Sequence, residues 1–386
     1  MNATAPDPNR TQARAELPDG RLDLRGLDRP ALIALAAPLG RPEHHARKVF
    51  KWAWQKDTRD LMEVEGITKE ARAWFVERLD LPRLESAGRF PSADGTIKYL
   101  WRLHDGHTIE SVLIPDEDRP GPNPPRYTLC VSTQVGCAMA CTFCLTGDLG
   151  LKRNLSAGEI ARQPLQVLAD MPKGRRITNI VLMGMGEPLH NYDNLTTALR
   201  IWLDDEGLNL SHRRITVSTV GLVPRLVRLA HELPVNIAIS LNATTEAQRR
   251  QVMPITSKYS LQELMDACRA LPLHGKKRIT FEYVMMAGFN ASLEDAARIE
   301  ALVEGIPAKV NLIPYNENPD RDIRRPSDAD VRAFQHHLVS RGVHCSVRTT
   351  RGRDVNAACG QLGKAAERMA RRVGAAASST GDAPPA

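Results

Sequence analysis

From residue 127 onward, two patterns of apolar and polar positions alternate along the chain. Short β-rich runs alternate with longer stretches in which apolar residues recur at helical spacing. The predicted strands cover 127–133, 177–183, 214–219, 235–241, 278–285 and 309–315. The predicted helices cover 156–168, 194–202, 224–231, 260–270 and 293–303. A helix over 328–340 and a seventh β run over 344–349 complete the pattern.

Six repeats of strand and helix imply parallel strands with helices on the outside. Two helices carry start signals, Ser156 with Glu159 three residues later and Ser260 with Glu263. The sequence therefore predicts an α/β fold, a partial, TIM-like (β/α)6 barrel.

The segment before the barrel has a different pattern. Residues 27–81 are helical and basic, and 97–103 and 107–114 form a predicted hairpin around Asp105-Gly106. We expect a disordered tail over 1–24, a small helical domain with the hairpin over 25–105, the barrel over 106–360 with its core at about 123–354, and a helix and disordered tail over 361–386. Val49, Phe50, Trp52 and Trp54 are interpreted as core, with RNA stacking as the alternative.

Composition narrows the class of protein. No apolar run among the 386 residues is long enough to cross a bilayer, and the N-terminus lacks a secretory signal, so we expect a cytoplasmic protein that contacts no membrane. Seven cysteines, an odd number, argue against a disulfide framework. The net charge of +7 favours a polyanion such as RNA, although many basic proteins bind none.

Cys137, Cys141 and Cys144 form a C-x3-C-x2-C loop after the first predicted barrel strand. A structural zinc site requires four ligands, and an ordinary iron–sulfur cluster takes four cysteines. Three thiolates on a four-iron cluster would leave one iron open to a substrate. A zinc site or a chance grouping stays open as the alternative.

Polar residues and glycines end or follow the other predicted barrel strands, except that Glu282 lies within the fifth. They are Gly184, Gly186, Glu187, Ser218, Ser240, Asn242, Glu282 and Asn316. Working groups of such barrels lie at the strand C-termini, so we expect these residues on one face. Each has a plain alternative as a cap, turn or loop residue. No complete G-x-G-x-x-G or P-loop motif supports a nicotinamide enzyme or an ATPase.

Two further cysteines have candidate roles. Cys130 lies in the first barrel strand, and Cys359 lies in a loop between small residues that suits an exposed, reactive thiol. A buried spectator is the usual role of a lone cysteine, and we assign it to Cys268 and Cys345.

Five motifs together carry a family resemblance: the cysteine loop, GMGEP (184–188), ISLNA (239–243), NLIPYN (311–316) and NAACGQL (356–362). In these the chain resembles the RlmN family, dual-specificity radical-SAM adenine-C2 methyltransferases. The resemblance covers nearly all of the chain between its tails. The Cfr resistance methyltransferase shares the motifs but modifies C8 of the same rRNA adenine, so C8 methylation stays open.

The resemblance implies a radical-SAM barrel with one [4Fe–4S] cluster on Cys137, Cys141 and Cys144. The open iron would bind S-adenosylmethionine (SAM). The SAM site would comprise Gly186, Glu187, Ser218, Ser240, Leu241, Asn242 and Asn316. One SAM would methylate Cys359, and a second would yield a 5′-deoxyadenosyl radical that acts on the S-methyl group.

The resemblance also implies how the product is released. Cys130 would resolve the covalent RNA adduct through a transient disulfide with Cys359, and Glu110 would accept the C2 proton. A strand carboxylate is usually at the surface, which is the alternative for Glu110.

The implied substrates are an adenosine of 23S rRNA at the peptidyl transferase centre and tRNAs next to the anticodon. The implied partners are these RNAs, contacted in part by the helical N-terminal domain, and an electron donor such as flavodoxin. We expect a monomer, because nothing in the sequence indicates an obligate interface.

Overall fold

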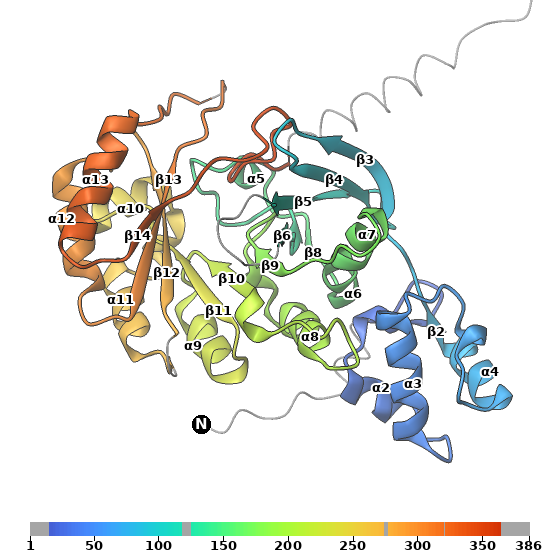
Figure 1. The fold of residues 1–386 in the computed structure, drawn as a ribbon. Coiled ribbons are helices and arrows are strands. Elements are labelled where there is room, and N and C mark those ends of the chain that lie inside the picture. The colour runs from blue at the N-terminus through green and yellow to red at the C-terminus, as the bar shows by residue number, and fades with distance from the viewer. Residues whose placement is uncertain (1–14, 118–124, 274–276, 320, 364–386) are drawn as a thin grey trace, which may run out of the picture.

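A curved sheet of parallel strands forms the centre of the molecule (Figure 1). The computed structural model describes residues 15–117, 125–273, 277–319 and 321–363. The parallel strands are β6 (Arg126–Cys130), β9 (Asn179–Leu182), β10 (Ile215–Thr219), β11 (Asn236–Ser240), β12 (Ile279–Met285), β13 (Ala308–Pro314) and β14 (Cys345–Val347). They lie in the order β14-β13-β12-β11-β10-β9-β6. Each falls within a predicted β run or within one residue of it, and the predicted α/β class is confirmed.

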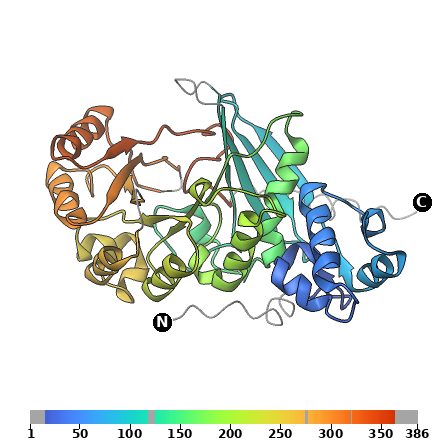
Figure 2. The same cartoon turned by 60° about the horizontal axis from the view of Figure 1, so that its bottom comes forward.

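Helices cover the outer face of this sheet (Figure 2). They are α6 (Ala157–Ala161), α7 (Gln163–Asp170), α8 (Tyr192–Leu203), α9 (Val223–Glu232), α10 (Glu246–Val252), α11 (Leu261–Ala270), α12 (Leu293–Val303) and α13 (Asp328–Ser340). Both predicted capping boxes, at Ser156 and Ser260, are present. The helix predicted over 156–168 is two helices, because Pro164 has no N–H to continue the hydrogen-bond ladder of α6. Helix α10 was not predicted.

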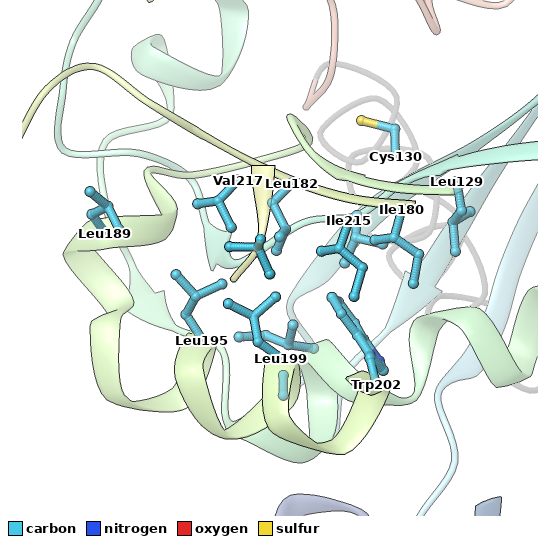
Figure 3. Packing of buried hydrophobic residues seen from close by; sticks show 14 of the residues in the cluster. Leu129, Cys130, Ile180, Leu182, Leu189, Leu195, Leu199, Trp202, Ile215 and Val217 are labelled. Atoms are coloured by element: carbon cyan, nitrogen blue, oxygen red, sulfur yellow. The ribbon is translucent and has the colours of Figure 1, made fainter. Parts of the chain in front are cut away.

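The core lies between the outer face of the sheet and these helices. Leu129, Ile180, Leu182, Ile215 and Val217 point from the strands toward Leu195, Leu199 and Trp202 of α8 (Figure 3). Cys130, next to Leu129 in β6, points to the other side of its strand (Figure 3). Alternation along each strand therefore separates an apolar outer side from an inner side that faces the barrel.

Three antiparallel strands extend the sheet beyond β6. They are β5 (Thr108–Asp116), β4 (Ile97–Arg102) and β3 (Glu85–Pro91), paired in that order. The predicted hairpin is β4–β5, and Gly106 in its turn has φ +81°. The domain boundary expected after residue 105 falls in the turn of this hairpin. Both strands of the hairpin belong to the same sheet as the barrel strands.

The N-terminal segment is helical and packs against α6. It contains β1 (Leu22–Asp23), α2 (Arg29–Leu35), α3 (Pro42–Gln55), α4 (Lys69–Arg78) and β2 (Leu79–Asp80). Val49, Phe50 and Trp54 are buried, which supports their interpretation as core, whereas Trp52 is half-buried and packs against the same core.

The tails differ in part from expectation. Residues 15–24 were expected to be disordered, but Glu16 bridges to Leu22 and β1 pairs with β2. The other expected tail residues, 1–14 and 364–386, lie outside the described residues. Within the described part of the chain, no helix combines the length and apolar character that crossing a membrane requires.

Candidate active site

The three cysteines of the loop line one cavity at the end of the sheet where the parallel strands stop. The Cys137 N–H donates to the Gly150 carbonyl and the Cys144 N–H to the Cys141 carbonyl, both at 3.1 Å. Gly136 has φ +75°, and a Cβ there would clash with the Gly150 carbonyl oxygen. This turn requires glycine, and it holds the loop open toward the cavity.

Buried thiols of this kind suit a metal cluster. Burial raises the pKa of Cys137 to about 12 and also raises the pKa values of Cys141 and Cys144. Metal coordination would instead favour the thiolates. No group of three or more His, Cys, Asp or Glu side chains within the described ranges is arranged to hold a single metal ion. Three thiols along one wall suit separate irons of a cluster better than one zinc ion.

Residues from the ends of five other strands line the same cavity. The structure brings together Gly186, Glu187, Ser218, Ser240, Asn242, Glu282 and Asn316. Leu241 does not line the cavity; its side chain is buried and its N–H donates to the Glu282 carbonyl (3.0 Å). Six of the seven expected SAM-site residues therefore share a wall with the cysteine loop.

Two of these residues are held firmly by the backbone. The Glu187 carboxylate accepts the N–H groups of Leu189 (3.0 Å) and Val220 (2.9 Å). Burial nevertheless raises the pKa of Glu187 to about 7. Asn242 has φ +55°, and its Oδ1 accepts the Val284 N–H (2.9 Å).

A buried arginine that sequence reasoning missed ties two strand ends together. Arg249 of α10 donates to the carbonyls of Val220 (2.6 Å) and Ser240 (3.3 Å) and to the Thr256 hydroxyl (3.0 Å). Burial lowers the pKa of Arg249 to about 10. The sequence gave no signal of this role, because the helix that carries Arg249 was not predicted.

Cys359 lines the cavity from the C-terminal loop, which runs over 348–363 and crosses from β14 to the antiparallel extension (Figure 1). The Asn316 amide donates to the Cys359 carbonyl (3.1 Å), and the Leu145 N–H donates to the Gly360 carbonyl (2.8 Å). Asn316 therefore also holds the Cys359 loop. Leu145 directly follows Cys144, so the loop is fastened to the cysteine loop as well.

Cys130 and Cys359 are close enough for the charge of one to affect the pKa of the other. Both are free thiols in this structure. Burial, together with the charge of Cys359, raises the pKa of Cys130 to about 12. Arg348, another residue that sequence reasoning missed, acts against both effects. The charge of Cys359 is the main cause of the raised pKa of Arg348, ahead of Glu282 and Cys130. The guanidinium of Arg348 therefore interacts with the thiols of both Cys130 and Cys359.

The turn between β3 and β4 holds the far side of the C-terminal loop. Asp94 accepts the Gly352 N–H (2.8 Å). Asp354 accepts the Ser92 hydroxyl (2.6 Å) and the Ala93 N–H (3.1 Å). The antiparallel extension therefore helps to position Cys359.

Glu110 is buried, contrary to the usual surface location of a strand carboxylate. Its carboxylate lies 3.8 Å from the ammonium of Lys98, which is also buried and donates to the Asn356 carbonyl (3.3 Å). Glu110 is not among the residues that line the cavity. It lies beneath the Cys359 loop, and Lys98, which sequence reasoning did not single out, links the two.

Comparisons with known proteins decide the family. A family model described as the radical SAM superfamily matches residues 131–299. The dual-specificity RNA methyltransferase RlmN of Anaeromyxobacter sp. (strain Fw109-5) is 49% identical over 351 residues, 89% of this chain and 91% of that protein. The RlmN of Pelobacter propionicus is 48% identical, over 89% of this chain and 96% of that protein. The chain belongs to the RlmN family.

A solved structure agrees with this membership. The crystal structure of a radical SAM methyltransferase from Sphaerobacter thermophilus matches with a TM-score of 0.79 at 41% identity, over 88% of this chain and 98% of that one. Membership of the radical SAM superfamily implies SAM and a [4Fe–4S] cluster. The cavity fits both groups, since it combines three thiols with polar strand ends and the half-buried cation Arg348.

Proposed function

We propose that this RlmN-family protein methylates C2 of an adenosine in 23S rRNA and in tRNAs. The observation that supports the proposal is that Cys359 shares one cavity with Cys137, Cys141 and Cys144. When bound, the cluster and SAM would supply a methyl group and a radical that abstracts hydrogen. A ring carbon between two nitrogens is electron-poor and cannot attack the SAM methyl group itself, so a carrier and a radical route are needed.

Each proposed ligand has a place in the cavity. Cys137, Cys141 and Cys144 would hold the cluster, with one iron left open for SAM. Gly186, Glu187, Ser218, Ser240, Asn242 and Asn316 line the remaining wall and would contact SAM, whereas Leu241 would act only through its backbone.

Cys359 would carry the methyl group to the RNA. Its thiolate would displace the methyl group of SAM, which requires the charged form. Arg348 is the cation beside this thiol, and its interaction with Cys359 is the main cause of the raised pKa of Arg348. After hydrogen abstraction, the S-methylene carbon would form a bond to C2 of adenine and join protein to RNA.

Release of the product would need a base and a second thiol. Glu110, held beside Lys98 under the loop, would take the C2 proton. The adduct would also have to lose its unpaired electron, for which the bound cluster would be the acceptor. The Cys130 thiolate would then attack the Cys359 sulfur, so that an S–S bond forms as the S–C bond breaks. The carbon would leave with the S–C electron pair and take up a proton to become the methyl group of adenine.

The test of this function is nucleoside mass spectrometry on RNA from cells that lack their own enzyme. Wild type should produce 2-methyladenosine in rRNA and tRNA, Cys359→Ala should produce none, and Cys345→Ala, a matched control in β14, should behave as wild type. Appearance of 8-methyladenosine would support the Cfr-like alternative. No methyladenosine with wild type would reject the proposal.

The roles of the two cysteines are tested separately. Cys130→Ala should accumulate protein covalently bound to RNA, visible as a shifted, nuclease-sensitive band on a denaturing gel. Cys268→Ala, a buried thiol in α11, is the matched control and should show no such band. An active Cys130→Ala enzyme without the adduct would disprove the resolving role.

A further inference from the structure

A second cavity, of about 590 Å³, lies inside the barrel toward the end where the parallel strands begin. It shares six residues with the cavity of the cysteine loop: Met183, Glu282, Ile313, Asn316, Arg348 and Cys359. Cys359 therefore lies in the wall that separates the two cavities. The cysteine loop borders only one of them.

The wall of the second cavity is polar. Each of the six parallel strands from β6 to β13 contributes a small side chain with hydrogen-bonding groups: Thr128, Asn179, Thr216, Asn236, Thr280 and Asn311. In β9 and β10, Asn179 and Thr216 alternate with the core residues Ile180 and Val217, so they face inward. A closed barrel normally fills this space with bulky apolar side chains. Here the space is open, and its wall suits a polar occupant.

Some of these groups are already oriented. The Asn236 amide donates to the Arg213 carbonyl (2.9 Å). The Asn311 amide donates to Glu282 (3.0 Å), and its oxygen accepts the Ser346 hydroxyl (2.6 Å). Amide and hydroxyl groups held in this way match the donors and acceptors on the edge of a nucleobase.

Positive charge lies at the mouth of this cavity. Arg213 precedes β10 and Lys309 is the second residue of β13, and both side chains are exposed. The carboxylates of the wall are Asp116 and Glu282. Asp116 pairs with Arg126 (3.0 Å), Glu282 accepts the Asn311 amide (3.0 Å), and burial raises the pKa of Glu282. The mouth therefore suits the phosphates of a nucleic acid.

We infer that the target nucleotide of the RNA enters through this mouth, with its base in the polar lumen against Cys359 and its phosphates near Arg213 and Lys309. The inference rests on the proposed function and adds the entry side and the base pocket. It explains why Cys359 lies in the wall between the two cavities: the RNA and SAM would approach one sulfur atom from opposite sides. A base must leave its stack to reach such a pocket, as in other enzymes that modify bases.

The test uses two kinds of variant in the full-length enzyme with its cluster. Arg213→Glu/Lys309→Glu reverses the charge at the mouth, and Thr216→Leu narrows the lumen without a charge change. Arg332→Glu, an exposed position on the outer helix α13, is the matched control. Binding of a labelled RNA hairpin is measured at several salt concentrations, methyladenosine by nucleoside mass spectrometry, and methylation of Cys359 by peptide mass spectrometry.

The double variant should weaken RNA binding by roughly tenfold or more and reduce the slope of log K against log salt concentration by about 2, one per lost phosphate contact. Thr216→Leu should lower methyladenosine at least tenfold. Both should still methylate Cys359 from SAM, because that step uses the other cavity. Thermal unfolding checks each fold, and the exposed charge variants keep the test valid if Thr216→Leu unfolds.

Two results would overturn the inference. One is RNA binding and methylation by both kinds of variant at the level of Arg332→Glu. The other is unchanged RNA binding with slower reduction of the cluster, which would assign the mouth to a protein electron donor. Methyladenosine from wild type in the same assay separates either result from a failure of the proposed function.

Discussion

At the scale of single residues, glycines decide how closely the chain can pass through the site. Gly186, between Met185 and Glu187, has φ +98°, and a Cβ there would lie 2.5 Å from Cβ of Gln134. The Glu187 N–H in turn donates to the Gln134 side chain (2.8 Å). Both the backbone angle and the close approach therefore require glycine at the start of the Glu187 turn.

Gly186→Ala should lower the free energy of unfolding by about 2–4 kcal/mol, because it adds a clash to a strained φ. Urea unfolding measures this change. Gly288→Ala is the matched control: Gly288 has φ +70° but open space around it, so only the strain of about 1 kcal/mol applies. Equal effects of the two substitutions would show that the contact with Gln134 contributes nothing.

At the scale of elements, the C-terminal loop depends on a turn about 260 residues earlier in the chain. Asp94 accepts the Gly352 N–H, and Gly352 has φ +66° with Thr96 and Ala357 close to its missing Cβ. Burial raises the pKa of Asp94, but hydrogen bonds from Gly352 and Thr96 outweigh it and lower the pKa to about 2. The turn thus fastens the loop through the charged form of Asp94.

Asp94→Ala should speed amide hydrogen exchange over residues 350–360 by about tenfold, the effect of losing roughly 1.4 kcal/mol of hydrogen bonding. Asp322→Ala, at an exposed aspartate, should change nothing. Because the pKa of Asp94 is lowered, its contribution is present above pH 3.8 and is lost as the pH falls through about 2. A wild-type loop that loses protection well above pH 4 would contradict this account.

At the scale of the whole molecule, a buried ion pair joins the N-terminal helical segment to the barrel. Asp23 of β1 pairs with Arg162 between α6 and α7, and both side chains are buried. Burial raises the pKa of Asp23, and Arg162 opposes this effect. Further out, Arg47 of α3 pairs with Glu206 after α8 at 3.0 Å, where Arg47 is largely exposed.

Arg162→Met should destabilise the docked segment by about 3–5 kcal/mol, since it leaves the Asp23 carboxylate buried without this cation. Limited proteolysis between residues 79 and 85 and urea unfolding both report the change. Arg47→Met, which breaks the exposed pair, should cost less than about 1 kcal/mol. Equal sensitivity of the two variants to protease would mean that the buried pair does not hold the segment.

The periodicity of the chain by itself determined the parallel strands, most of the outer helices and the cap residues Ser156 and Ser260, because these depend on local spacing and local hydrogen bonds. It also placed the cysteine loop and the polar strand ends on one face, since parallel strands end at the same edge of a sheet. Only the tertiary structure decided which distant groups meet. Lys98 at the Asn356 carbonyl, Arg348 beside Cys130, and Asp94 under the Cys359 loop each join segments far apart in sequence, and no local spacing encodes such contacts. The open polar lumen was equally beyond the sequence, because alternation alone does not tell whether an inner face is filled or left for a ligand.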